Sequence, residues 1–137
     1  MVEEFIHGRE VEVAVLGNDS PSASVCGEID SGAEFYDYEA KYITDTSVAY
    51  VPARIDEDTA EKVREYAICA YQALDCKGLS RVDFFVTYEG NRIVFNEINT
   101  LPGFTSISMY PKLFEASGIA YSQLIDKLLE YAMEGAK

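Results

Sequence analysis

Polar side chains at fixed positions on β-prone runs constrain this chain more than any other feature. Residues 81–108 begin with two apolar runs rich in valine, isoleucine and phenylalanine, and a glycine-containing turn signal separates them, which predicts a β-hairpin. Arg81 and Asp83 are two residues apart and share a face of the first strand, as Glu97 and Asn99 do on the second. Burying such groups without partners costs free energy, so we expect something to satisfy them.

The register of this hairpin decides whether its acids meet. A two-residue turn at Glu89–Gly90 would place them on opposite faces of the sheet. A three-residue turn over Glu89–Asn91 instead places Asp83 opposite Glu97 and aligns the other two polar residues with each other. We predict the three-residue turn. The alternative is a solvated polar face on an antiparallel sheet, which the spacing alone does not exclude.

The chemistry of these positions favours a hard divalent cation. Asp83, Glu97 and Asn99 offer carboxylate and amide oxygens with no nitrogen or sulfur donor, which suits Mg²⁺ and argues against zinc or iron. Three protein oxygens do not complete an octahedron, and Mg²⁺ takes its remaining ligands from water and substrate phosphate. The pattern therefore predicts a magnesium site beside a phosphate-bearing ligand.

A glycine- and hydroxyl-rich loop follows the hairpin. Pro102-Gly103 predicts a tight turn that lets backbone N–H groups approach a ligand. Thr105, Ser106 and Ser108 add hydroxyl groups just before an expected helix start, where the helix dipole favours anions. A turn followed by a Ser/Thr cap explains this loop alone better, but beside the hairpin the loop favours binding of an anion.

Composition excludes two classes of partner. The 137 residues contain 11 Lys and Arg against 24 Asp and Glu, a formal net charge of -13, which repels nucleic acid and anionic membranes. We expect one domain over residues 1–137. Cys26, Cys69 and Cys76 lack metal-ligand spacing, and no signal-peptide pattern or membrane-spanning run is seen, so we expect a cytoplasmic setting. Cys69 is expected in the core.

Periodicity predicts the other elements of an α+β fold, an antiparallel sheet flanked by helices. Strands are expected over Val2–Ile6, Arg9–Leu16 and Ser24–Ile29, and helices over Asp58–Leu74, Pro111–Ala116 and from Ser122 to near Gly135. Asp58 and Ser122 are the expected helix caps, and Ile43–Tyr50 is expected to be a surface loop. The acids of the first two strands, Glu3, Glu4, Glu10 and Glu12, are by default edge or surface groups.

Three stretches together resemble a known family. They are RVDFF (81–85), FYDYEAKY (35–42) and VFNEINTLPGFTSISMYPKLF (94–114). They are similar to the carboxy-terminal half of the D-alanine–D-alanine ligases, of the ATP-grasp superfamily, and the likeness extends from EEFIHGREVEVAVLG to the last helix. The resemblance implies the C-terminal lobe of an ATP-grasp fold, with the N-terminal and central lobes absent.

The resemblance also implies roles for residues of the hairpin and the loop. Asp83, Glu97 and Asn99 match ligands of two Mg²⁺ ions, with Mn²⁺ as an alternative, that hold the phosphates of ATP. Arg81 and the N–H of Gly103 match groups that stabilise an acyl phosphate and a tetrahedral intermediate.

Other positions match the binding sites for the two substrates. Ser108 and Met109 match residues that hold the carboxylate of the second D-alanine. Five positions match the nucleotide site: Glu3 and Ile6 at the adenine, Glu10 at the ribose, Lys41 at the transferred phosphate, and Tyr42 on a loop that closes the site.

The activity implied is an ATP-dependent carbon–nitrogen ligase that joins two D-alanines through an acyl phosphate for peptidoglycan precursor synthesis. D-serine and D-lactate ligases are alternatives, but the intact EAKY run, and Met109 rather than arginine after Ser108, resemble the D-alanine type. Another ATP-grasp carboxylate–amine ligase or a non-catalytic interaction domain remains open. The resemblance implies a homodimer for the full-length enzyme, and we expect the isolated chain to fold with little or no ligase activity.

Overall fold

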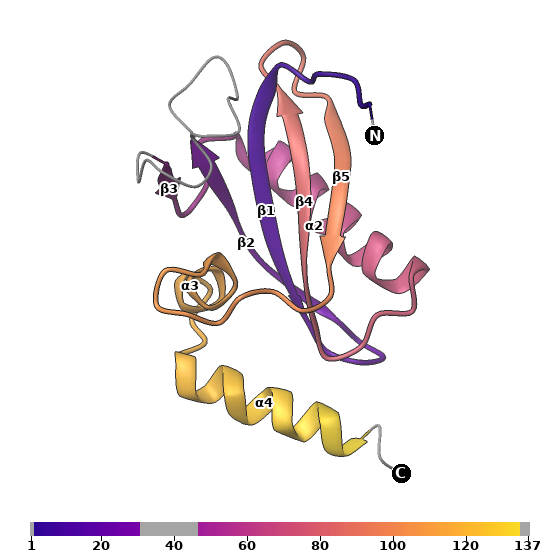
Figure 1. Ribbon diagram of the computed structural model, residues 1–137, viewed down its shortest axis with the longest axis vertical. Helices are drawn as coiled ribbons and strands as arrows, with labels where there is room; N and C mark the ends of the chain where they lie inside the picture. Colours follow the sequence, from indigo (N-terminus) through magenta and orange to yellow (C-terminus); the bar gives the residue numbers. More distant parts are fainter. Residues whose placement is uncertain (1, 31–46, 135–137) are drawn as a thin grey trace.

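One antiparallel sheet of five strands, in the order β3-β2-β1-β4-β5, forms the centre of the molecule (Figure 1). The computed structural model describes residues 2–30 and 47–134. The strands are β1 (Gly8–Leu16), β2 (Ser22–Asp30), β3 (Val48–Tyr50), β4 (Leu79–Thr87) and β5 (Ile93–Asn99), and the helices are α2 (Glu57–Ala73), α3 (Met109–Ala116) and α4 (Tyr121–Glu134). The predicted α+β fold class is confirmed.

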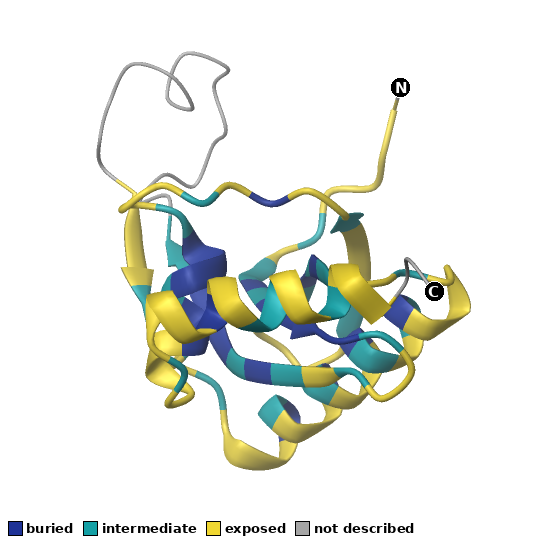
Figure 2. Ribbon diagram, turned by 90° about the horizontal axis from the view of Figure 1, so that it is seen from below, coloured by how far each residue is buried: buried dark blue, intermediate teal, exposed yellow. Residues whose placement is uncertain are grey.

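Alternation along β1 separates two cores on the two faces of the sheet. Val11, Val13 and Val15 are fully buried in the core beneath α2. Ala14 and Leu16 face the other way and pack with α3 and α4. Helix α2 contacts four strands, whereas the main strand contacts of α3 are with β1 and β2, at one end of the second face (Figure 1). Figure 2 shows buried residues gathered between the sheet and the helices. None of the described helices covers the rest of the second face.

The predicted pairing within the β4–β5 hairpin is confirmed, because Asp83 lies opposite Glu97. The three-residue turn over Glu89–Asn91 from which we derived it is wrong. The N–H of Thr87 donates to the carbonyl of Arg92 at 3.0 Å, so the turn contains four residues. A turn with an even number of residues would by itself place the acids on opposite faces.

A β-bulge in β5 restores the predicted register. Phe84 pairs with Phe95, whereas the adjacent Asp83 pairs with Glu97, which leaves Asn96 as an extra residue. Side chains of β5 beyond the bulge therefore change face relative to a regular strand. Phe95 stays on the α2 side, with its ring 5.9 Å from that of Phe84, and Glu97 joins Asp83 on the other face.

One predicted strand and part of one predicted loop are wrong, because strands need partners. Val2–Ile6 is irregular, since the β1–β4 ladder ends where Gly8 pairs with Thr87, followed by one bond from the N–H of Tyr88 to the carbonyl of His7 at 3.4 Å. Val48–Tyr50, which we expected in a loop, is the edge strand β3 because it pairs with the end of β2. The rest of the predicted loop, except Ser47, and the aromatic run 35–42 lie outside the described residues.

The helix α2 buries the predicted stripe of Val63, Ala67 and Tyr71. Its N-cap is Asp56 rather than Asp58, because the carboxylate of Asp56 accepts the N–H of Thr59 at 2.9 Å. Likewise α4 begins at Tyr121, so Ser122 is not its cap.

The prediction that Cys69 packs in the core is wrong. Its side chain is exposed, because a residue two positions from both Ala67 and Tyr71 lies on the opposite side of a helix. Cys26 is the buried cysteine, on β2.

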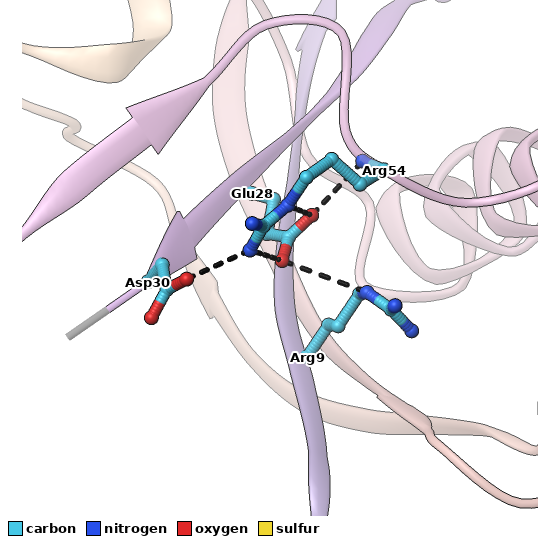
Figure 3. A network of polar contacts seen from close by, with 4 residues as sticks. All are labelled: Arg9, Glu28, Asp30 and Arg54. Carbon is cyan, nitrogen blue, oxygen red and sulfur yellow. Dashed lines mark hydrogen bonds and ion pairs between the residues drawn. The ribbon is translucent and has the colours of Figure 1, made fainter. Parts of the chain in front are cut away.

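The buried carboxylate of Glu28 on β2 binds Arg54 in the segment before α2 (Figure 3). Glu28, 2% exposed, accepts hydrogen bonds from the backbone N–H and the guanidinium of Arg54, the shortest at 2.6 Å. Arg54 also binds Asp30, and the Nε of Arg9 lies 3.6 Å from Glu28. Since an unpaired buried carboxylate is costly, these contacts hold the chain leading into α2 against the sheet.

The two cysteines should differ strongly in reactivity. Burial raises the pKa of the Cys26 thiol to about 12, which suppresses the reactive thiolate, whereas Cys69 is exposed. With a thiol reagent such as DTNB on the folded chain, we expect Cys69 to react first and Cys26 last. Cys69→Ser should remove the fastest phase and Cys26→Ser should leave it unchanged. A fast phase that survives in Cys69→Ser contradicts this assignment.

Candidate functional site

Three carboxylates form a row across the open half of the second face. Glu12 on β1 pairs with Asp83 on β4, which pairs in turn with Glu97 on β5. The side chains of Glu12 and Asp83 are only 13% and 12% exposed, whereas Glu97 at the end of the row is exposed. Arg81 and Asn99 pair with each other one step along the same face. The structure thus brings together all four polar residues predicted on the hairpin.

The guanidinium of Arg81 binds Asp83 through two parallel hydrogen bonds. Its Nε donates to Oδ1 and its Nη2 to Oδ2, each at 2.8 Å, the bidentate geometry of a strong arginine–carboxylate pair. These bonds raise the pKa of Arg81, and desolvation opposes them. The pair is possible because residues two apart on a strand project on one side.

Glu12 is a site residue that the sequence interpretation missed. We expected an edge or surface acid, but β1 lies between β2 and β4 and the side chain is mostly buried. Its Oε2 lies 3.5 Å from the Nε of Arg81 and accepts no hydrogen bond from the described residues. Burial raises the pKa of Glu12 to about 7, with Arg81 acting against it. Its alternation with Val11 and Val13 indicated which face of the strand Glu12 occupies, but not that the strand lies inside the sheet.

The loop after β5 folds back on itself through Ser108. The hydroxyl of Ser108 accepts the N–H of Thr105 at 3.0 Å and lies 2.8 Å from the Thr105 hydroxyl, so it does not cap α3. Gly103 approaches closely, since an added Cβ would lie 2.8 Å from the Ser108 Oγ. The predicted turn residue and the predicted substrate-binding serine are therefore neighbours.

Met109, which follows Ser108, does not present its side chain to the loop. It is 7% exposed in the core between the sheet and α3, and a Cβ added at Gly27 would lie 2.5 Å from its Cε. Only backbone groups of Met109 are available for a role at the site.

The predicted nucleotide-binding residues are less closely gathered. Glu10 is half-buried on β1 and shares the face of Glu12. Glu3 is exposed and Ile6 half-buried in the irregular segment before β1. Two further positions, Lys41 and Tyr42, lie outside the described residues.

The donor set fits a hard cation in type, and its members lie on one face of the sheet. Asp83, Glu97 and Asn99 supply oxygen ligands on one face of two paired strands. Within residues 2–30 and 47–134, however, no group of three or more His, Cys, Asp or Glu side chains is already arranged around a metal position. Both Asp83 oxygens bind Arg81, and the Asn99 Oδ1 accepts the N–H of Leu101 at 3.1 Å. A cation would have to displace or share these bonds.

Solved ligase structures share this fold. The VanG D-Ala:D-Ser ligase from Enterococcus faecalis superposes with a TM-score of 0.84 at 46% identity, covering 94% of this chain and 37% of that one. The D-alanine–D-alanine ligase from Bacillus anthracis complexed with ATP gives a TM-score of 0.77 at 31% identity, covering 96% and 42%. The five-stranded sheet and its helices therefore have the fold of part of an ATP-grasp ligase.

A match to a protein-family model identifies which ATP-grasp ligases this chain is related to. The model described as D-ala D-ala ligase C-terminus matches residues 1–130, and the chain belongs to this family, which confirms the resemblance noted in the sequence. The D-alanine–D-alanine ligase of Chlorobium luteolum is 60% identical over 134 residues, which are 98% of this chain but 37% of that relative. The chain thus spans little more than a third of the length of this relative.

Titration of Glu12 should make folding stability depend on pH. Its folded-state pKa of about 7 exceeds the ordinary value of 4.5, so the folded chain holds the proton more tightly. The resulting stability is complete below about pH 4.5 and is lost as the pH rises through about 7. We expect the free energy of unfolding in urea to fall for the wild type relative to Glu12→Gln as the pH rises. The difference should change in favour of Glu12→Gln by on the order of 1–3 kcal/mol between about pH 4.5 and 8.

The control for this experiment is Glu89→Gln, in the exposed hairpin turn, whose stability difference from the wild type should not change with pH. A stability difference between Glu12→Gln and the wild type that stays constant over the same range contradicts the shifted pKa.

Proposed function

We propose that the chain is the C-terminal part of an ATP-dependent ligase that joins two D-alanines through an acyl phosphate, as a step in peptidoglycan precursor synthesis. The observation that carries the proposal is the register in which Asp83 lies opposite Glu97 beside Arg81 on an uncovered face. Membership of the D-ala D-ala ligase C-terminus family supports it. The ATP complex of the Bacillus anthracis relative supports the choice of nucleotide.

In this proposal the chain contributes the phosphate side of the reaction. Asp83, Glu97 and Asn99 would hold two Mg²⁺ ions, or Mn²⁺, which neutralise phosphate charge. Such neutralisation is needed because the chain carries a formal net charge of -13. Arg81 and the N–H of Gly103 would stabilise the negative charge that develops on the acyl phosphate and on the tetrahedral intermediate.

The remaining residues would bind the substrates. Ser108 would donate its hydroxyl to the carboxylate of the second D-alanine, after releasing its contact with Thr105, and Met109 would contribute only backbone groups. Five residues would line the nucleotide site: Glu3, Ile6, Glu10, Lys41 and Tyr42. The first D-alanine would bind to the part of the enzyme that this chain does not include, and the full-length enzyme would be a homodimer.

A second candidate is a D-alanine–D-serine ligase. It is favoured by the superposition with the VanG D-Ala:D-Ser ligase at a TM-score of 0.84. We favour D-alanine because of the EAKY run and because Met109 stands where an arginine would suggest another second substrate.

We place the activity in the cytoplasm. Among the described helices, none has the length and apolar character needed to span a membrane.

The chain alone should bind Mg²⁺-ATP weakly. In a calorimetric titration with ATP, we expect binding that requires Mg²⁺ and that Asp83→Ala or Glu97→Ala removes, because each substitution deletes an oxygen ligand. The control Asp19→Ala changes an equally charged, 95% exposed side chain outside the site and should leave binding intact. A non-catalytic interaction domain would show the same result with and without Mg²⁺.

Ser108 should act on the second substrate of the full-length enzyme. Ser108→Ala removes a hydroxyl donor to a carboxylate and should raise the KM for the second D-alanine roughly tenfold or more, with little change in the KM for ATP. Wild-type turnover should be faster with D-alanine than with D-serine or D-lactate as second substrate. Faster turnover with D-serine would establish the VanG-like alternative instead.

A further inference from the structure

Arg81 has two carboxylates within reach and hydrogen-bonds to only one of them. Its Nε and Nη2 donate to Asp83, each at 2.8 Å. Glu12 approaches from β1, with its Oε2 3.5 Å from the same Nε. That Oε2 is buried and accepts no hydrogen bond from the described residues, which is a costly state for a carboxylate oxygen. A free acceptor thus lies directly beside a donor that is already in use.

Asp83, which accepts both hydrogen bonds from Arg81, is also one of the residues proposed to bind a cation. If Asp83 is a cation ligand, as proposed above, its two oxygens cannot keep both bonds to a guanidinium and also coordinate a divalent ion without bringing like charges together. The Nε of Arg81 would need to move only roughly 0.6 Å, from 3.5 Å to a hydrogen-bond length of about 2.9 Å, to reach Glu12.

We infer that Glu12 is a positioning residue: it accepts the hydrogen bond of the Arg81 guanidinium when Asp83 turns toward a divalent cation. The exchange frees Asp83 while keeping Arg81 at the site. The inference rests on the proposed function, because it requires Asp83 to be a cation ligand.

Two features single out Glu12 among the acids of this face. In the part of the chain that the structure describes, Glu12 and Asp83 are the only carboxylates within 4.0 Å of the Arg81 guanidinium, although Glu10 and Glu97 share the face. The backbone of Glu12 pairs with Gly27 on one side and with Asp83 on the other. Because β1 is held by two neighbouring strands, the acceptor stays in place while the Asp83 side chain rotates.

Manganese affinity tests this exchange without reference to activity. We would titrate the chain with Mn²⁺ alone at about pH 8, where Glu12 is ionised, and follow free Mn²⁺ by electron paramagnetic resonance. Glu12→Gln should weaken binding about three- to tenfold, because Arg81 then keeps Asp83. In the Arg81→Gln background the same substitution should have an effect of less than about twofold. Equal losses in both backgrounds overturn the inference, since Glu12 would then act as a simple charge or ligand.

Two further variants separate this inference from the proposed function. Glu89→Gln, which removes an exposed charge in the hairpin turn, should bind Mn²⁺ like the wild type, and a loss equal to that of Glu12→Gln overturns the inference. If Asp83→Asn weakens binding and Glu12→Gln does not, only the role of Glu12 is overturned. If Asp83→Asn binds as tightly as the wild type, the proposed cation site fails and the inference fails with it.

The wild-type chain offers a readout that no folding defect can obscure. The side-chain Nε–H resonance of Arg81, observed by ¹⁵N NMR, should shift on addition of Mg²⁺ as its acceptor changes from Asp83 to Glu12. In Glu12→Gln the resonance should keep its cation-free position or broaden. A wild-type resonance that does not respond to Mg²⁺ at concentrations that shift the backbone signal of Asp83 overturns the inference.

Discussion

One extra residue in β5 determines which chemistry the open face of the sheet can perform. The bulge at Asn96 places Glu97 opposite Asp83, whereas an uninterrupted ladder from the four-residue turn would direct Glu97 toward α2. On that side it would meet the apolar core around Phe84 and Val82, where an unpaired carboxylate is costly. The bulge therefore suits both faces: aromatic and aliphatic groups remain beneath α2, and carboxylate and amide oxygens lie on the surface that no described helix covers.

The carboxylate row is retained at an electrostatic cost. Like charges directly opposite each other on neighbouring strands destabilise a sheet, and here Glu12, Asp83 and Glu97 follow one another across three strands. Arg81 compensates only in part, since its hydrogen bonds go to Asp83 and leave the Oε2 of Glu12 without a donor among the described residues. An apolar or neutral pairing would stabilise the fold more, so the carboxylate row supports the cation site proposed above.

Much of the fold and of the site could be predicted from local patterns. Alternation of valines identified β1, and the stripe through Val63 and Tyr71 identified α2, because both depend only on the periods of strand and helix. The wrong predictions concern features that depend on which strands lie next to each other. Val2–Ile6 pairs with no strand in the described part of the chain, and the pattern of Glu12 is the same on an edge strand as on a central one. The predicted turn was wrong but the predicted register was right, because the four-residue turn and the bulge each shift the pairing by one residue and the two shifts cancel.

By itself the sequence determined which oxygen-bearing side chains are present, how they are spaced along each strand, and which ligase family the chain belongs to. All three depend only on which residues occur and in what order. Only the tertiary structure decided that β1 lies between β2 and β4, that Asn96 bulges, and that Glu12 reaches Arg81 from another strand. Strand order and register follow from the packing of the whole sheet against α2 and α3, and no local pattern carries that information.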